Sequence, residues 1–172
     1  INRSAKLSSL IYIFYERLTS FIDSYDIFVS KTEFLEASKY GLINNNKYFI
    51  VPNGVTKQNV SIDSIKNRDQ LKRELHIPTN KTTIMTLCRL DKIKNLFEFI
   101  NIAAVCTSYN FLIVGGGDLE KDLKEYILNR NLKNIRLTGF ISNPISFLLA
   151  SDIYLSTSFR EGHPISILEA MS

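Results

Sequence analysis

The second half of the chain alternates short apolar runs with longer amphipathic segments, and this alternation limits the fold more than any other feature. The expected strands are residues 83–87, 111–114, 135–137 and 153–155, and the expected helices are 96–106, 119–130, 145–150 and 165 onward. Continuously apolar strands separated by helices are typical of parallel sheets covered on both faces. The sequence therefore predicts an α/β fold, a Rossmann-like parallel sheet with helices on both faces.

The first half carries weaker signals. Apolar residues at helical spacing from Leu7 to Ile22 predict an amphipathic helix packed against another element, and a polar face that is not rich in basic residues disfavours a membrane-surface helix. Residues 27–29 and 48–51 indicate short strands, the first of them buried. Between them a helix is expected to begin at a Ser30 or Thr32 cap, to run through Lys39 and to be ended by Gly41. A polar stretch at 56–67 predicts a linker or surface loop, and 69–75 a short helix.

Composition sets the class of protein. The 172 residues are 45% apolar and 22% charged, which is enough for one domain, or for one domain and part of another. The chain begins at Ile1 and ends at Ser172 inside a helical pattern, so we expect a piece of a longer protein, cut at both ends. The net charge of +4 comes from residues 56–98 and suits either a phosphate-bearing ligand or a solvated face. No aromatic-basic pattern of a nucleic-acid binder is present, so nucleic acid is not expected as a partner.

Cysteine and histidine spacing argues against metal and redox chemistry. Cys88 and Cys106 lie in apolar segments without metal-ligand spacing, which favours core residues in a reducing compartment. His76 and His163 are far apart in sequence and do not suggest a metal site by themselves. The apolar run 10–15 is too short to cross a bilayer, and the expected location is the cytoplasm.

Polar residues follow each expected strand, where open parallel sheets bind ligands. Arg89 and Lys94 come after the first strand, residues 115–117 are all glycine after the second, and Glu161 follows the fourth. Surface charges and a tight turn explain the basic pair and the glycines equally well. The glycines are not a dinucleotide-binding fingerprint, because its third glycine is replaced by Glu120. Glu169 interrupts an apolar run that predicts burial, and a buried carboxylate needs hydrogen-bond donors around it.

Together these residues resemble a known family. Ser158-x-x-Glu161-Gly162-x-Pro164-x-x-x-Leu168-Glu169-Ala170-Met171-Ser172 is similar to the E-x7-E motif of retaining glycosyltransferases of the GT-B fold, the family 4-like "glycosyl transferases group 1". Further similar segments occur in the family's order: Arg89-Leu90-x-x-x-Lys94 and residues 51–55, 74–78, 114–117 and 137–140. Two positions depart from the usual pattern, because Cys88 replaces a glycine and Pro164 removes one backbone N–H.

The resemblance implies two Rossmann-like domains, of which the C-terminal one binds a nucleotide-sugar donor. By this reading 1–52 is the end of the N-terminal acceptor domain, 53–67 the interdomain connector and loop, and 68–172 the incomplete donor domain. The implied activity is transfer of a hexose, with retention, from a UDP- or GDP-linked donor to a saccharide or lipid-linked acceptor in cell-surface polysaccharide or glycolipid biosynthesis. This fragment alone is expected to be inactive. A UDP-sugar 2-epimerase of the same fold and a non-catalytic nucleotide-sugar-binding module remain alternatives.

The resemblance also assigns roles. Arg89 and Lys94 neutralise the departing diphosphate, Glu161 contacts the hexose, and Glu169 accepts hydrogen bonds from the ribose hydroxyls. Phe140 or Ile141 flanks the base, and the helix opening near Pro164 offers backbone N–H groups to the phosphates. The remaining donor contacts that the resemblance implies are Gly115, Gly116, Gly162, His163 and Ile165. A pair of glutamates also occurs in glycoside hydrolysis, but the basic pair favours a phosphate ligand.

The resemblance implies no metal, no cofactor and no protein nucleophile, because the nucleotide sugar is the substrate, and it assigns no catalytic base. Peripheral contact with the inner face of the plasma membrane is expected through the N-terminal domain. The sugar, the base and the acceptor cannot be read from this chain.

Overall fold

A computed structural model describes residues 11–18, 25–43, 47–56 and 68–172. The chain divides into two compact units, one formed by residues 1–54 with 162–165 and the other by 55–161 with 166–172. Residues 1–10, 19–24, 44–46 and 57–67 lie outside the description, and with them most of the expected linker and both ends of the first expected helix. No helix in the described ranges is long and apolar enough to cross a membrane.

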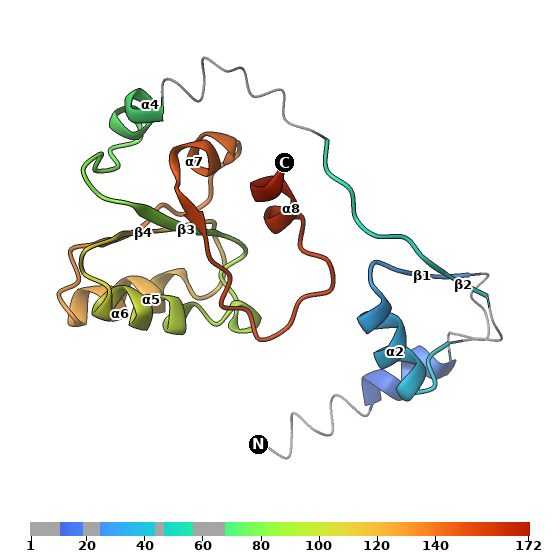
Figure 1. The fold of residues 1–172 in the computed structure, drawn as a ribbon. Coiled ribbons are helices and arrows are strands. Elements are labelled where there is room, and N and C mark those ends of the chain that lie inside the picture. The colour runs from blue at the N-terminus through green and yellow to red at the C-terminus, as the bar shows by residue number, and fades with distance from the viewer. Residues whose placement is uncertain (1–10, 19–24, 44–46, 57–67) are drawn as a thin grey trace. The chain divides into compact units, whose positions relative to one another are not determined.

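The first unit contains a two-stranded parallel sheet of β1 (Asp26–Phe28) and β2 (Tyr48–Ile50), with helix α2 (Lys31–Lys39) between them in sequence (Figure 1). The Ser30 hydroxyl accepts the Glu33 N–H at the start of α2, and Gly41 follows the helix with a φ of 65°. Phe34 of α2 stacks on Tyr48 and meets Phe28 edge-on. The expected cap, helix and strands are therefore confirmed.

The expected burial in this unit is wrong. Ile27 of β1 is 68% exposed, and residues 11–18 are helical but leave Phe14 61% exposed. A two-stranded sheet covered by one short helix shields one side of its strands at most, so the apolar side chains on the other side stay in contact with solvent. The apolar pattern predicted the elements correctly, but it carried no information about what covers them.

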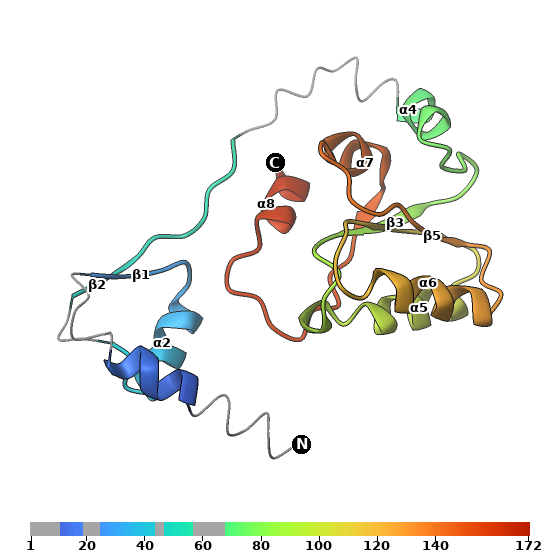
Figure 2. The same cartoon turned by 180° about the vertical axis from the view of Figure 1, so that it is seen from behind.

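The second unit is built on a parallel sheet of the order β5-β4-β3-β6. Its elements are α4 (Arg68–Glu74), β3 (Thr83–Leu87), η1 (Lys92–Lys94), α5 (Leu96–Val105), β4 (Asn110–Val114), α6 (Glu120–Asn129), β5 (Ile135–Leu137), α7 (Ile145–Ala150), β6 (Ile153–Tyr154) and α8 (Ile165–Met171). Helices α5 and α6 lie on one face of the sheet and α4 and α7 on the other (Figures 1 and 2). The α/β fold class is confirmed.

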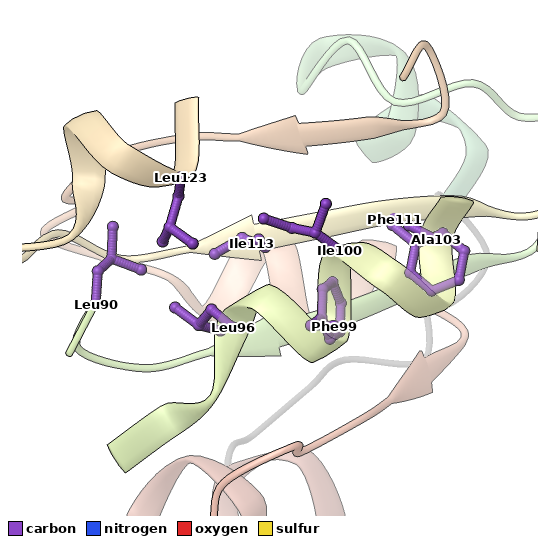
Figure 3. Close-up of a cluster of buried hydrophobic side chains, with 8 residues drawn as sticks. All are labelled: Leu90, Leu96, Phe99, Ile100, Ala103, Phe111, Ile113 and Leu123. Atoms are coloured by element: carbon purple, nitrogen blue, oxygen red, sulfur yellow. The ribbon is translucent and has the colours of Figure 1, made fainter. Parts of the chain in front are cut away.

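Two hydrophobic clusters hold the helices to the sheet. Figure 3 shows the larger cluster, in which Phe99 of α5 meets Phe111 of β4 edge-on at 5.5 Å between ring centroids. Its buried members are Leu90, Leu96, Phe99, Ile100, Ala103, Phe111, Ile113 and Leu123. The smaller cluster fills the opposite face and includes Ile77, Met85, Leu112, Val114, Phe147 and Ala150. Burial on both faces explains why these strands read as continuous apolar runs.

A network of one hydrogen bond and two ion pairs around Asp152 fixes β6 beside β3. The Asp152 carboxylate accepts the Thr83 N–H at 2.7 Å and pairs with Lys72 at 2.9 Å and Arg68 at 3.1 Å. Burial works to raise the pKa of Asp152, but the Thr83 N–H and the two cations outweigh it, so the pKa lies below its ordinary value. This network joins α4, β3 and the start of β6.

Two glycines let the loops after β3 and β4 cross closely. A Cβ atom on Gly115, whose φ is 139°, would lie 1.9 Å from the Cys88 carbonyl oxygen, and one on Gly117 would lie 2.7 Å from the Leu90 backbone. Leu90 in turn donates its N–H to the Gly116 carbonyl at 3.1 Å. These glycines therefore have a packing role that does not depend on a ligand.

Candidate functional site

The order of the sheet creates a switch point beside β3. The chain passes from β3 to β4 on one side, and β6 later pairs with β3 on the other side. In open α/β sheets, ligands bind outside the carboxyl ends of the strands at such a point, because loops there leave in opposite directions. The loops after β3 and β6 carry the predicted residues Lys94 and Glu161.

The loop after β3 is shaped by its own side chains. The Asp91 carboxylate accepts the backbone N–H groups of Ile93 at 2.9 Å and Lys94 at 3.3 Å, and so caps the turn η1. Asn95 then takes a left-handed conformation with a φ of 50°, which ends the turn and begins α5. Lys94 is thereby placed at the last position of a capped turn.

The structure brings Lys94 and Glu161 together. The Lys94 ammonium donates to Glu161 Oε1 at 2.7 Å, and the Ser158 hydroxyl donates to the same oxygen at 2.6 Å. The two ionic side chains are 21% and 26% exposed. Burial lowers the pKa of Lys94, but the hydrogen bond and the charge of Glu161 outweigh it, so the pKa is raised and the ammonium stays charged.

Arg89 is placed differently. Its guanidinium lies 3.7 Å from the Asp118 carboxylate, and the two side chains are 70% and 85% exposed. An ion pair this exposed contributes about 0–1 kcal/mol, so Arg89 is available to an incoming anion. Gly115 and Gly116 lie where the loop after β4 crosses the loop after β3, which carries Arg89. Asp118 was not identified from the sequence as a partner of Arg89. Its position directly after the three glycines that follow β4 is the sequence feature that could have indicated it.

Cys88 directly follows β3 and precedes Arg89 in the same loop. Burial raises the pKa of its thiol to about 11, and Lys94 and the Thr86 side chain only partly offset this. The half-buried thiol is therefore protonated at neutral pH and is not a nucleophile.

Glu169 is not buried as expected, because no residue of α8 is buried. Glu169 is half-buried and lines a cavity of about 150 Å³ with residues of α7, β6 and the end of α8. The apolar residues of α8 resemble a core helix in sequence, yet Ile165 and Met171 are exposed, and β6 is the edge strand of the described sheet. None of the other predicted site residues lines this cavity.

The first turn of α8 is tied to the sheet by Tyr154 of β6. Its hydroxyl donates to the Leu87 carbonyl at 2.9 Å and shares a hydrogen bond of 2.9 Å with the Ser166 hydroxyl. Sequence reasoning missed Tyr154, Ser158 and Asp91 as site-forming residues. The S-x-x-E and D-x-x-K spacings were the signals that point to the last two.

The other residues predicted to contact the donor are Phe140, Ile141, Gly162, His163 and Ile165. Phe140 is 80% exposed and packs near Gly116, and Ile141 is half-buried. Gly162, His163 and Ile165 group with the first unit, where the Asn53 amide donates to the His163 carbonyl at 2.7 Å. The roles that the resemblance gives these residues stay predictions. The described ranges hold no group of three or more His, Cys, Asp or Glu side chains suited to a metal ion.

The sequence pattern of the family described as "Glycosyl transferases group 1" matches residues 67–172. The chain belongs to this family. This family member is 33% identical over 134 residues to the UDP-Gal:alpha-D-GlcNAc-diphosphoundecaprenol alpha-1,3-galactosyltransferase of Escherichia coli, covering 73% of the chain and 34% of the relative. It is 28% identical over 132 residues to an uncharacterized glycosyltransferase of Methanocaldococcus jannaschii, covering 74% and 32%. It thus spans about a third of the length of these curated relatives.

Solved structures agree on the fold. Anabaena Alr3699/HepE, determined with UDP and glucose, superposes with a TM-score of 0.78 at 20% identity over 92% of this chain and 44% of that one. The glycosyltransferase family member described here therefore has part of the GT-B fold, and the fold expected from the resemblance is confirmed.

Proposed function

We propose that this chain contains most of the donor-binding domain of a glycosyltransferase that moves a hexose from a UDP-linked donor to a saccharide or lipid-linked acceptor with retention. The observation that carries the proposal is the Lys94–Glu161 pair at the switch point, with Arg89 exposed on the same loop as Lys94. The family membership supports the transferase class. The E. coli relative, named for UDP-Gal and a diphosphoundecaprenol-linked acceptor, supports UDP and a lipid-linked acceptor.

The charges suit the bond that breaks. When the bond between the anomeric carbon and the diphosphate opens, its electron pair stays on the diphosphate, so negative charge grows there. Lys94, kept charged by its raised pKa, and Arg89 are the cations that we propose to stabilise this charge. The acceptor oxygen then bonds to the anomeric carbon, and its proton passes to the departing phosphate oxygen on the same face of the sugar.

Glu161 has a separate role in the proposal. Its carboxylate is held by Lys94 and Ser158, so its position is fixed before the donor arrives. Both donors bind Oε1, so the other carboxylate oxygen, Oε2, can accept a hydrogen bond from a hydroxyl of the hexose. A contact of this kind positions the sugar, and the proposed chemistry requires neither a protein nucleophile nor a metal.

The test assays the purified parent protein with UDP-hexoses as donors and a polyprenyl diphosphate-linked saccharide as acceptor. Transfer with the anomeric configuration of the donor is expected, and Lys94→Met should transfer at a strongly reduced but still measurable rate. Inversion in the product contradicts retention. A UDP-sugar converted to its 2-epimer without any acceptor supports the epimerase, and a donor bound but left intact supports the binding module.

A further inference from the structure

The loop that carries Lys94 is bound along its length by the loop that carries Glu161. The Phe159 N–H donates to the Ile93 carbonyl at 2.9 Å, and the Thr157 hydroxyl lies 3.1 Å from the carbonyl oxygens of both Lys94 and Asn95. Three consecutive carbonyls of one loop are therefore met by donors from the other. The ion pair of Lys94 with Glu161 is one of several connections between these loops.

The Thr157 hydroxyl lies at the point where the first loop changes direction. Lys94 is the last residue of η1, and Asn95 is left-handed, a conformation that asparagine adopts more readily than most non-glycine residues. After Asn95 the chain enters α5 at Leu96, and the Asn95 carbonyl also accepts the Glu98 N–H at 3.1 Å. The single proton of Thr157, shared between the two carbonyls, stabilises the backbone on both sides of this bend.

We propose that Thr157 is a positioning residue of the transfer site: it fixes the Lys94 backbone so that the ammonium reaches Glu161 and the diphosphate of the donor. This inference rests on the proposed function of Lys94. Thr157 contacts neither the donor nor the reacting atoms in the proposal, and it acts through Lys94. Valine has the same shape as threonine but lacks the donor, whereas serine keeps it.

The experiment compares the parent protein with Thr157→Val, Thr157→Ser, Lys94→Met and the double variant Thr157→Val/Lys94→Met. We expect Thr157→Val to lower kcat about five- to twentyfold with less than a twofold change in acceptor KM, and Thr157→Ser to stay within about twofold of the parent. On the Lys94→Met background, Thr157→Val should have no further effect, because both changes remove the same contribution. Thr107→Val, the same substitution at an exposed position, is the matched control and should leave kcat unchanged.

Amide hydrogen exchange gives a readout that does not need activity. In Thr157→Val, exchange should be faster within 91–96, while Thr157→Ser and the remaining strands behave as in the parent. A Thr157→Val variant with parental kcat and exchange overturns the proposal. So do effects that add to those of Lys94→Met, or that serine does not rescue. A parent protein that neither binds UDP nor transfers refutes the proposed function instead, and exchange at 91–96 still decides whether Thr157 fixes the loop.

Discussion

Replacing Glu161 by Gln separates binding of the nucleotide from transfer of the sugar. In the structure, Glu161 holds the Lys94 ammonium at 2.7 Å, so an incoming diphosphate competes with a carboxylate for the same cation. Gln keeps the size of the side chain and an acceptor for Ser158, but it removes the charge. We therefore expect the variant to bind UDP at least as well as the parent protein and to transfer more slowly.

The magnitudes follow from the type of hydrogen bond. A charge-assisted hydrogen bond contributes about 1 kcal/mol more than a neutral one, and the Lys94 and Glu161 side chains are 21% and 26% exposed, which keeps solvent screening moderate. Removing about 1 kcal/mol of competition for the ammonium corresponds to a Kd for UDP about fivefold lower. Loss of an anionic acceptor for the hexose should lower kcat by about tenfold or more.

The assay is calorimetric titration of UDP into the parent protein and Glu161→Gln, combined with initial rates of transfer. Glu125→Gln is the matched control, since Glu125 pairs with Lys121 at 4.0 Å on an exposed helix surface and should change neither quantity. A tenfold loss of UDP affinity in Glu161→Gln would show that the carboxylate supports the nucleotide and does not compete with it. Unchanged turnover would remove Glu161 from the proposed site.

Four further outcomes are expected. In urea titrations at pH 7, Asp152→Asn should lower the free energy of unfolding by about 2 kcal/mol, because Lys72 loses its charged partner. The pKa of Asp152 is lowered in the folded state, so the difference in free energy between parent and variant should shrink as the pH falls through the ordinary value of 3.8 and below. At pH 8, Cys88 should react with iodoacetamide about a hundredfold more slowly than a peptide thiol, by mass spectrometry, because its pKa is raised from 9.0 to about 11; a rate like that of the peptide would contradict its burial. Tyr154→Phe should speed amide exchange at Leu87, whose N–H donates to the Tyr154 hydroxyl, and at Ser166 and the rest of α8, while residues 83–86 of β3 stay protected; unchanged exchange in α8 would show that the hydroxyl does not hold the helix. EDTA should leave transfer unchanged, and activity that is lost and then restored by Mg²⁺ would overturn the metal-free proposal.

Much of the second unit could be predicted from sequence. The bounds of β3, β5 and α7 match the expected ranges, because strands buried on both faces leave unbroken apolar runs and tight turns separate them. The burial of β1 and α8 could not be predicted in the same way. A residue's own sequence neighbours reveal that a side chain is apolar, but not whether another element lies over it.

The candidate site was only partly visible in the sequence. The residue types were identified, and the parallel topology placed the strand ends at one edge. The contact of Lys94 with Glu161, 67 residues apart in sequence, needed the order of the strands, because only the pairing of β6 with β3 puts the two loops side by side. The connections of Thr157 and Ser158 depend on loop conformations that no periodic pattern describes.

The pairing that completes the site also affects when the site forms during folding. Ile84 of β3 pairs with Phe111 of β4 through a short connection, but with Ile153 of β6 only after a segment more than twice as long has been enclosed. Closing the longer segment costs more chain entropy, and β6 is two residues long. We therefore expect β3, β4 and β5 to assemble first and β6 to join last. A nascent chain would hold a packed half-domain before Lys94 meets Glu161, and transient opening of β6 would separate these two residues while the rest of the sheet stays folded.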